Sequence, residues 1–232
     1  MKIYGLNKTT LLDYPEHVAA TVFTGGCNFC CPFCHNKELV LCPEGQPLIT
    51  ETEIFDFLKK RKGIITGVCI TGGEPTLQPD LKEFLTKVKE IGLKVKLDTN
   101  GYRPEIVKEI LEHGLADYVA MDIKSCQAGY REAAGREDID MSRIEESVSY
   151  LMEGKVEYEF RTTIVKEFHT EEIVEEIGKW ICGCRAYYLQ SYEENENVIC
   201  KGFHACTKEE LAVYKRIMSS YVKNVGLRGV QM

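Results

Sequence analysis

Short apolar runs alternate with amphipathic helical patterns along most of the chain. The segments between the apolar runs repeat hydrophobic residues at helical spacing, and one of them opens with Pro79 and closes with Gly92, residues expected at the two ends of a helix. The pattern therefore predicts about six β-α units. The apolar runs that have the length and residue types of strands cover residues 17–23, 64–71, 93–98, 117–123, 156–165 and 185–190.

Regular alternation of strands and helices favours parallel strands joined by right-handed helical crossovers. The predicted fold class is α/β, either an open doubly wound sheet or a barrel. A length of 232 residues fits one such domain, and no linker composition divides the chain. We expect a single domain over residues 1–232, with a core at about 17–190 and a C-terminal loop, helix and strand at about 191–232.

The composition excludes several classes of function. The net charge is −7, and no cluster of Lys and Arg interleaved with aromatic residues suggests a nucleic-acid partner. No apolar run reaches the roughly 18 residues of a membrane helix, and the first residues lack the apolar segment of a signal peptide. Eleven cysteines, an odd number, are typical of metal ligands in a reducing compartment rather than of a disulfide framework. We expect a cytoplasmic protein with no nucleic-acid or membrane partner.

Four motifs follow the predicted strands. A cysteine cluster comes after the first strand, "TGGEP" (71–75) after the second and "DTNG" (98–101) after the third, and "MDIK" (121–124) ends the fourth. In sheets and barrels of parallel strands, functional residues lie at the carboxyl ends of the strands. The motifs therefore predict one functional site at that edge.

The cysteine cluster, "GGCNFCCPFCHN", allows three spacings. Two Cys-x2-Cys pairs that follow each other directly leave no chain between them for a tetrahedral zinc site. A ferredoxin run needs a cysteine where Phe33 stands. The remaining frame is Cys27-x3-Cys31-x2-Cys34, whose three thiolates leave the fourth iron of a [4Fe-4S] cluster open, as in catalytic zinc sites. Cys30 has no place in this frame, and we interpret it as a bystander thiol.

This spacing, followed by His35 and Asn36, resembles the signature of the radical S-adenosylmethionine (SAM) enzymes. The resemblance implies a [4Fe-4S] cluster bound by Cys27, Cys31 and Cys34, and SAM chelated to the open iron by its amino and carboxylate groups. An electron passed through the cluster then breaks the sulfonium C–S bond and leaves methionine and a 5′-deoxyadenosyl radical. No side chain is then needed as a catalytic residue, because the cofactors carry the chemistry.

Two of the other motifs are candidate SAM-binding elements. "TGGEP" resembles the glycine-glycine-glutamate-proline motif, in which the backbone and the glutamate receive the SAM ammonium. The Asn-Gly pair of "DTNG" is typical of a hairpin turn, but the helical pattern from Pro104 favours a β-to-α turn that faces the ligand.

The second half of the chain offers further candidates. "MDIK" fits a structural salt bridge or the Asp-x-Lys segment with which glycyl-radical activating enzymes reach SAM. Arg161 fits the SAM carboxylate or an ion pair with a neighbouring side chain, and Gln190 fits a ribose or adenine contact. The predicted SAM contacts are Phe33, His35, Gly72, Gly73, Glu74, Asp98, Thr99, Asn100, Asp122, Lys124, Arg161 and Gln190.

Nearly the whole chain resembles the activating proteins of anaerobic (class III) ribonucleoside-triphosphate reductase. The resemblance implies a partial (β/α)6 TIM-like barrel with a radical SAM core, an electron from reduced flavodoxin or ferredoxin, and removal of the α-hydrogen of one glycine in the partner reductase. Cys30 stands where that family favours arginine. The matching stretches, in order, are "KTTLLDYPEHVAATVFTGGCNFCCPFCHNKELV", "TGGEPTLQ", "KLDTNGY", "YVAMDIK", "FRTTIVKEFHT", "YYLQSY" and "VGLRGV".

Other functions fit parts of the same pattern. Activation of pyruvate formate-lyase or another glycyl-radical enzyme uses identical chemistry, and 7-carboxy-7-deazaguanine synthase is a small radical SAM enzyme that acts on a metabolite. An iron-sulfur electron carrier is a further alternative, but it would give "TGGEP" and "MDIK" no function.

We interpret the late stretch 191–206 as a functional loop, and we expect Cys69 in the core. A second metal or cluster would use Cys182, Cys184, Cys200 and Cys206.

Overall fold

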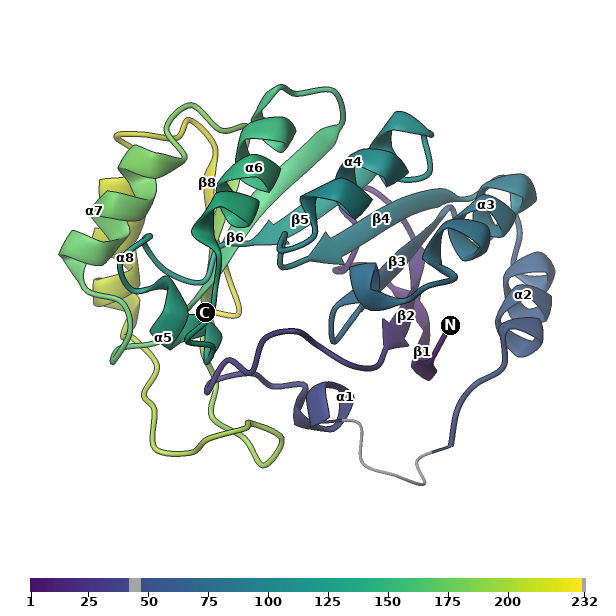
Figure 1. Cartoon of the computed structure of the whole chain (residues 1–232), viewed down its shortest axis with the longest axis horizontal. Helices are drawn as coiled ribbons and strands as arrows, with labels where there is room; N and C mark the ends of the chain where they lie inside the picture. Colours follow the sequence, from purple (N-terminus) through teal and green to yellow (C-terminus); the bar gives the residue numbers. More distant parts are fainter. Residues whose placement is uncertain (42–46, 231–232) are drawn as a thin grey trace. The chain divides into compact units, whose positions relative to one another are not determined.

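The computed structural model describes residues 1–41 and 47–230, and Cys42 lies outside the described residues. The strands follow chain order in an eight-stranded sheet, and the predicted α/β class with mostly parallel strands is confirmed (Figure 1). The strands are β1 (Ile3–Thr10), β2 (Ala19–Thr24), β3 (Gly67–Gly72), β4 (Lys94–Thr99), β5 (Tyr118–Asp122), β6 (Glu157–Ile164), β7 (Tyr187–Ser191) and β8 (Val225–Arg228). The helices are α1 (Lys37–Leu41), α2 (Glu51–Lys60), the 3-10 turn η1 (Pro75–Leu77), α3 (Leu81–Ile91), α4 (Pro104–Glu112), α5 (Tyr130–Ala134), α6 (Met141–Met152), α7 (Glu171–Trp180) and α8 (Lys208–Met218).

All six predicted strands are present, as β2 to β7, and the helix and strand expected at the C-terminal end are α8 and β8. The sequence pattern does not predict β1. This strand pairs antiparallel with β2 with two irregularities in its register, and most of its side chains are exposed or half-buried. Such an edge strand lacks the regular apolar alternation that marks a strand in a sequence. Among the described residues, every helix is too short or too polar to cross a membrane.

The chain forms two compact units. Cys27 belongs to the first unit and Cys31 and Cys34 to the second, so the boundary falls inside the cysteine loop. The expectation of a single domain stays a prediction. The first unit is Met1–Asn28 with Glu38–Ala120, and the second is Phe29–Lys37 with Met121–Met232.

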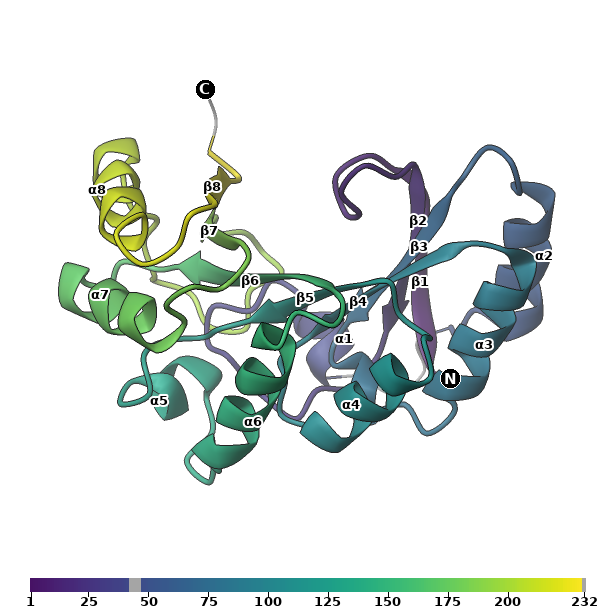
Figure 2. The same ribbon diagram turned by 90° about the horizontal axis from the view of Figure 1, so that it is seen from above.

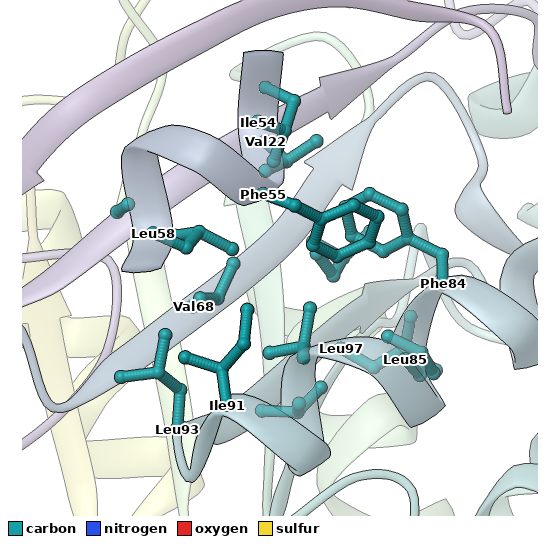
Figure 3. Close-up of a cluster of buried hydrophobic side chains, with 14 of the residues drawn as sticks. Val22, Ile54, Phe55, Leu58, Val68, Phe84, Leu85, Ile91, Leu93 and Leu97 are labelled. Carbon is teal, nitrogen blue, oxygen red and sulfur yellow. The ribbon is translucent and has the colours of Figure 1, made fainter. Parts of the chain in front are cut away.

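The helices of the first unit cover one face of its strands and bury the apolar core there (Figure 3). Helix α2 begins with a capping box formed by Thr50 and Glu53, and α3 ends at Gly92, whose φ of +90° suits glycine. Each fully buried Leu or Phe of the core contributes about 2 kcal/mol. The core side chains labelled in the figure are Val22, Ile54, Phe55, Leu58, Val68, Phe84, Leu85, Ile91, Leu93 and Leu97.

The other face of the same strands carries polar side chains. Thr21, Cys69 and Lys96 stand beside one another in register across β2, β3 and β4, and all three are buried. The Lys96 ammonium donates to the carboxylate of Asp98 and lies 3.8 Å from the Cys69 sulfur. Cys69 is therefore buried, as predicted, but its neighbours are charged rather than apolar.

In the second unit, β6, β7 and β8 run parallel, and α7 and α8 lie side by side (Figures 1 and 2). A capping box of Thr207 and Glu210 begins α8. Arg228 of β8 stacks over the Tyr188 ring of β7 and makes two hydrogen bonds, at 2.5 and 2.8 Å, with the carboxylate of Glu159 on β6. This bidentate pair ties three strands together.

Candidate functional site

The start of the cysteine loop lies against the backbone of "TGGEP" in the first unit. The N–H of Gly73 donates to the carbonyl of Thr24 at 2.8 Å, and the N–H of Glu74 donates to the carbonyl of Gly26 at 2.8 Å. A Cβ on Gly72 would stand 2.3 Å from the Thr24 oxygen, and a Cβ on Gly73 would stand 2.1 Å from the Gly26 oxygen. Both distances are far shorter than a van der Waals contact, so only glycine fits at either position.

These contacts explain why glycine is needed at positions 72 and 73. The motif suggests that they make room for a ligand, whereas the structure fills the space with the chain's own backbone. Gly72 also has a φ of +119°, which side chains other than hydrogen rarely allow. Gly72 and Gly73 as SAM contacts stay a prediction, and the geometry gives them the further task of placing the residues before Cys27.

Glu74 is buried, with 1% of its surface exposed, and its carboxylate accepts four hydrogen bonds. Oε1 accepts from the N–H and hydroxyl of Thr76 at 3.1 and 2.6 Å and from the Thr99 hydroxyl at 2.8 Å. Oε2 accepts from the N–H of Asn100 at 2.7 Å. Burial raises the pKa of Glu74, although these hydrogen bonds oppose the rise. The carboxylate therefore joins η1 to the turn after β4, in addition to any contact with SAM.

Two amide side chains hold the first part of the cysteine loop. Nδ2 of Asn100 donates to Oδ1 of Asn28 at 2.8 Å and lies 3.9 Å from the Cys27 sulfur. Nε2 of Gln78 donates to the carbonyl of Gly25 at 2.8 Å. The "DTNG" turn therefore acts on the cysteine loop itself. Sequence reasoning misses Asn28 and Gln78, although the first lies inside the cysteine cluster and the second lies just after "TGGEP".

Asp98 and Thr99, the first two residues of "DTNG", also have partners within the first unit. The carboxylate of Asp98 accepts from Lys96, and the thiol of Cys69 lies 3.7 Å from the same oxygen. The hydroxyl of Thr99 donates to Glu74. Both side chains stabilise the end of β4, and their contacts with SAM stay predictions.

Helix α5 holds the second part of the cysteine loop, in the second unit. The N–H of Cys30 donates to the carbonyl of Ala134 at 3.0 Å. Gly135 ends the helix with a φ of +62°, and a Cβ there would stand 2.0 Å from the Cys30 carbonyl oxygen. Cys30 is exposed, whereas Cys31 is buried. This difference agrees with Cys30 as a bystander, which stays a prediction.

The late stretch 191–206 also binds the cysteine loop. The N–H of Cys200 donates to the carbonyl of Pro32 at 2.8 Å, and the N–H of Ile199 donates to the carbonyl of Cys34 at 3.1 Å. These bonds connect segments that lie far apart in the sequence. The stretch therefore fixes the backbone that carries Cys34, which gives its interpretation as a functional loop a physical basis.

A charged cluster stands at the end of β5 in the same unit. Oδ1 of Asp122 accepts from Nε of Arg161, and Oδ2 accepts from Nζ of Lys124 at 2.9 Å. Burial would raise the pKa of Asp122, but the two cations hold it well below its usual range. The pKa of Lys124 is raised in spite of burial, because Asp122 stabilises the ammonium. Both predicted ion pairs, that of "MDIK" and that of Arg161, are thus present.

The thiol of Cys31 is buried and that of Cys34 is half-buried, and the Lys124 ammonium of this cluster acts on both. Burial raises the pKa of Cys31 to about 12 and also raises the pKa of Cys34, and the Lys124 ammonium opposes both shifts. A turn closed by the N–H of Cys34 and the carbonyl of Cys31, at 3.0 Å, brings the two residues together. Two sulfur donors and a cation therefore share one region of the second unit.

Phe33, His35 and Gln190 also belong to the second unit. The ring of Phe33 is buried and packs against Phe168, with centroids 5.3 Å apart. Nε2 of His35 donates to the carbonyl of Glu193 at 2.6 Å. Gln190 is half-buried near the end of β7. The SAM contacts of these three residues stay predictions.

The sulfur donors fit an iron-sulfur cluster. The ten described cysteines are thiols rather than halves of disulfides. Within residues 1–41 and 47–230, no three His, Cys, Asp or Glu side chains are placed to hold a single metal ion. Thiolate is the ligand type that iron-sulfur clusters take in proteins, so the chemistry of the donors in the cysteine loop suits such a cluster. The same finding gives no support to a second metal site at Cys182, Cys184, Cys200 and Cys206.

Comparisons with known proteins agree with the motifs. A family model described as the Radical SAM superfamily matches residues 21–181. A Methanocaldococcus jannaschii protein, "Putative glycyl-radical enzyme activating enzyme MJ1227", is 34% identical over 237 aligned residues, which cover 98% of this chain and 96% of that protein. The pyruvate formate-lyase-activating enzyme of Clostridium pasteurianum is 33% identical over 142 residues, or 58% of each chain.

Solved structures extend the likeness to the fold. Streptococcus suis SuiB bound to S-adenosylmethionine superposes with a TM-score of 0.68 over 90% of this chain and 49% of that chain, at 17% identity. The family model covers well over half of the sequence, including the cysteine loop and all four motifs. The chain therefore belongs to the radical SAM superfamily, and its cofactors are a [4Fe-4S] cluster and S-adenosylmethionine.

Proposed function

We propose that the protein activates a glycyl-radical enzyme and that this partner is anaerobic ribonucleoside-triphosphate reductase. The cluster of Asp122, Lys124 and Arg161 carries the proposal. It shares a unit with Cys31 and Cys34, and its lysine is close enough to both thiols to oppose the rise in their pKa. In the activating enzymes that this sequence resembles, the Asp-x-Lys segment reaches SAM.

The relatives support an activase. The Methanocaldococcus jannaschii protein, which is named as an activating enzyme, aligns over nearly the full length of both chains. The choice of the reductase as partner rests on the stretches of sequence that resemble its activating proteins, from "KTTLLDYPEH" to "VGLRGV". A reduced flavodoxin or ferredoxin would supply the electron. The cytoplasmic location expected from the cysteine content belongs to this proposal.

In this proposal Cys27, Cys31 and Cys34 hold the cluster, while Lys124 and Arg161 offer positive charge to the SAM carboxylate. Asp122 orients these two cations through both carboxylate oxygens. When bound, the reduced cluster and SAM would supply a 5′-deoxyadenosyl radical, with methionine as the other fragment of SAM, for removal of the α-hydrogen atom of a partner glycine. The protein binds SAM in one orientation, excludes water and presents the glycine.

A pair of cysteine variants tests the cluster and the reaction class together. Protein reconstituted with iron and sulfide without oxygen should release 5′-deoxyadenosine from SAM when dithionite is added. Cys31→Ala should lose the cluster absorbance and the release. Cys30→Ala is the matched control, because this exposed neighbour lies outside the three-cysteine frame. An intact cluster without any release contradicts the enzyme and favours an electron carrier.

Electron paramagnetic resonance identifies the partner. The reduced protein and SAM should produce a glycyl-radical signal on anaerobic ribonucleoside-triphosphate reductase. Pyruvate formate-lyase is the second candidate, because the Clostridium pasteurianum activating enzyme matches more than half of this chain. A signal on the lyase and none on the reductase would reverse the assignment.

A further inference from the structure

Three side chains hold the backbone at the end of β5, where "MDIK" lies. The hydroxyl of Tyr130 donates to the carbonyl of Asp122 at 3.3 Å, and the hydroxyl of Thr162 donates to the carbonyl of Ile123 at 2.8 Å. Nε2 of His169 lies 3.0 Å from the carbonyl of Lys124. Three successive carbonyls are thus bound by side chains from α5, from β6 and from the segment after β6.

His169 can serve this carbonyl in only one of its two neutral tautomers. Its Nδ1 lies 3.0 Å from the nitrogen of Val165, whose N–H can donate to it, and 3.1 Å from the carbonyl oxygen of Val165. The carbonyl of Val165 already accepts from the backbone N–H groups of Phe168 and His169, at 3.1 and 3.0 Å. A proton on Nε2 therefore lets Nε2 donate to the Lys124 carbonyl while Nδ1 accepts from the N–H of Val165.

The environment keeps the imidazole neutral and fixed. His169 has 1% of its surface exposed, and burial lowers its pKa. The hydroxyl of Tyr214 on α8 donates to the His169 carbonyl at 2.7 Å, so the residue is also fixed through its backbone. The rings of Phe33 and His169 meet edge to face, with centroids 6.4 Å apart. The imidazole therefore lies between Phe33 of the cysteine loop and the backbone of Lys124.

We propose that His169 is a positioning residue for SAM binding, and that it acts by holding the Lys124 backbone so that the lysine side chain keeps its place beside Asp122. This inference rests on the proposed function, in which Lys124 contacts SAM and Asp122 orients it. The ammonium of Lys124 reaches Asp122 at 2.9 Å, and loss of the backbone bond would free the residue that carries this ammonium.

Two substitutions separate the two hydrogen bonds of the ring. His169→Gln places an amide N–H where Nε2 stands and keeps the bond to the Lys124 carbonyl. His169→Asn places an amide oxygen where Nδ1 stands and keeps only the bond from the Val165 N–H. Each variant leaves one buried backbone group without a partner, so the two should lose similar unfolding free energy. His169→Gln releases the N–H of Val165, whereas His169→Asn releases the carbonyl of Lys124.

The affinity for SAM is measured by calorimetry on the reconstituted protein without reductant, which avoids turnover. We expect His169→Gln to bind SAM within about twofold of the unchanged protein and His169→Asn to bind about tenfold more weakly. Equal affinities in the two variants at similar stability would overturn the positioning role. Failure of the unchanged protein to bind SAM would instead overturn the proposed function, and the inference with it.

A second measurement does not depend on the variants folding. The 15N chemical shifts of the imidazoles in the unchanged holoprotein at pH 7.5 report each tautomer, and the sequence has five histidines to distinguish. We expect His169 as the neutral form with the proton on Nε2. A neutral ring with its proton on Nδ1 would leave Nε2 without a hydrogen to donate to the Lys124 carbonyl and would overturn the proposal.

Discussion

The two units hold their parts of the cysteine loop by different means. The first unit uses backbone and uncharged groups, because Gly73 binds Thr24 and Asn100 binds Asn28 beside Cys27. The second unit places an ionic cluster of Asp122, Lys124 and Arg161 near Cys31 and Cys34. The first arrangement depends on shape, and the second adds charge to backbone bonds such as that from Cys30 to Ala134. Substitutions that add bulk should therefore have their largest effect in the first unit. Substitutions that remove a charge should have theirs in the second unit.

The largest effect should come from adding one methyl group in the first unit. Gly73→Ala forces a Cβ to within 2.1 Å of the Gly26 backbone oxygen, and backbone on both sides leaves little room to relax. We expect a loss of about 3 kcal/mol in unfolding free energy and severalfold less iron bound per chain after reconstitution. Urea denaturation and iron analysis measure the two quantities.

Gly5→Ala is the matched control for that substitution. Its new Cβ would lie 3.2 Å from the flexible side chain of Phe23, which can move. This variant should keep nearly all of its iron. If Gly73→Ala also keeps its iron, the close backbone packing at Gly73 is not what holds the cysteine loop in the first unit.

Removal of one charge in the second unit should have the next largest effect. Asp122→Asn leaves Arg161 and Lys124 as neighbouring cations without their counter-ion, and we expect a loss of roughly 2 kcal/mol in unfolding free energy. The exposed pair of Lys179 and Glu175 provides the control, since Lys179→Met should leave the stability nearly unchanged. Similar results for the two variants in urea denaturation would contradict a role for charge balance.

The smallest effect concerns one of the charged groups of the first unit. Asp117 accepts from Lys89 at 2.7 Å, from Lys94 at 2.8 Å and from the N–H of Val95 at 2.9 Å. Burial opposes ionisation, but these donors hold the pKa of Asp117 below its ordinary 3.8. A lowered pKa stabilises the fold above pH 3.8, and this stabilisation is lost as the pH falls below that value.

Asp117→Asn tests this linkage. The variant should be about 1 kcal/mol less stable than the unchanged protein at pH 7, and the difference should shrink below pH 3.8. Urea midpoints at pH 7, 4.5 and 3.3 measure it. If the difference in stability between the two proteins stays constant over this pH range, the charge of the Asp117 carboxylate contributes nothing to the stability of the fold.

The sequence predicts the fold well wherever burial is periodic. Strands β2 to β7 carry buried apolar residues, those of β2 to β4 in the core under the helices of the first unit, and these apolar runs are visible in the sequence. The edge strand β1 escapes prediction, because its side chains are mostly exposed and its register is broken twice. Burial, rather than strand formation as such, produces the signal.

The candidate site divides in a similar way. The three-cysteine frame and the motifs at the strand ends can be recognised in the sequence because the residues of each motif lie within a few positions of one another. The bonds of Gln78 to Gly25 and of His169 to Lys124 join residues 53 and 45 positions apart, and no periodic pattern marks them. Glu74 shows a further limit, because its motif indicates a ligand contact while its carboxylate also accepts four internal hydrogen bonds.

The bonds from Ile199 and Cys200 to the cysteine loop have a consequence for biosynthesis. The chain is made from its N-terminus at about 5–20 residues per second, so Cys34 emerges roughly 10–30 s before these two residues. During that interval the loop lacks the hydrogen bonds to Cys34 and Pro32 that the finished fold provides. The backbone around Cys34 therefore reaches its final set of hydrogen bonds only after residues 199 and 200 have been made.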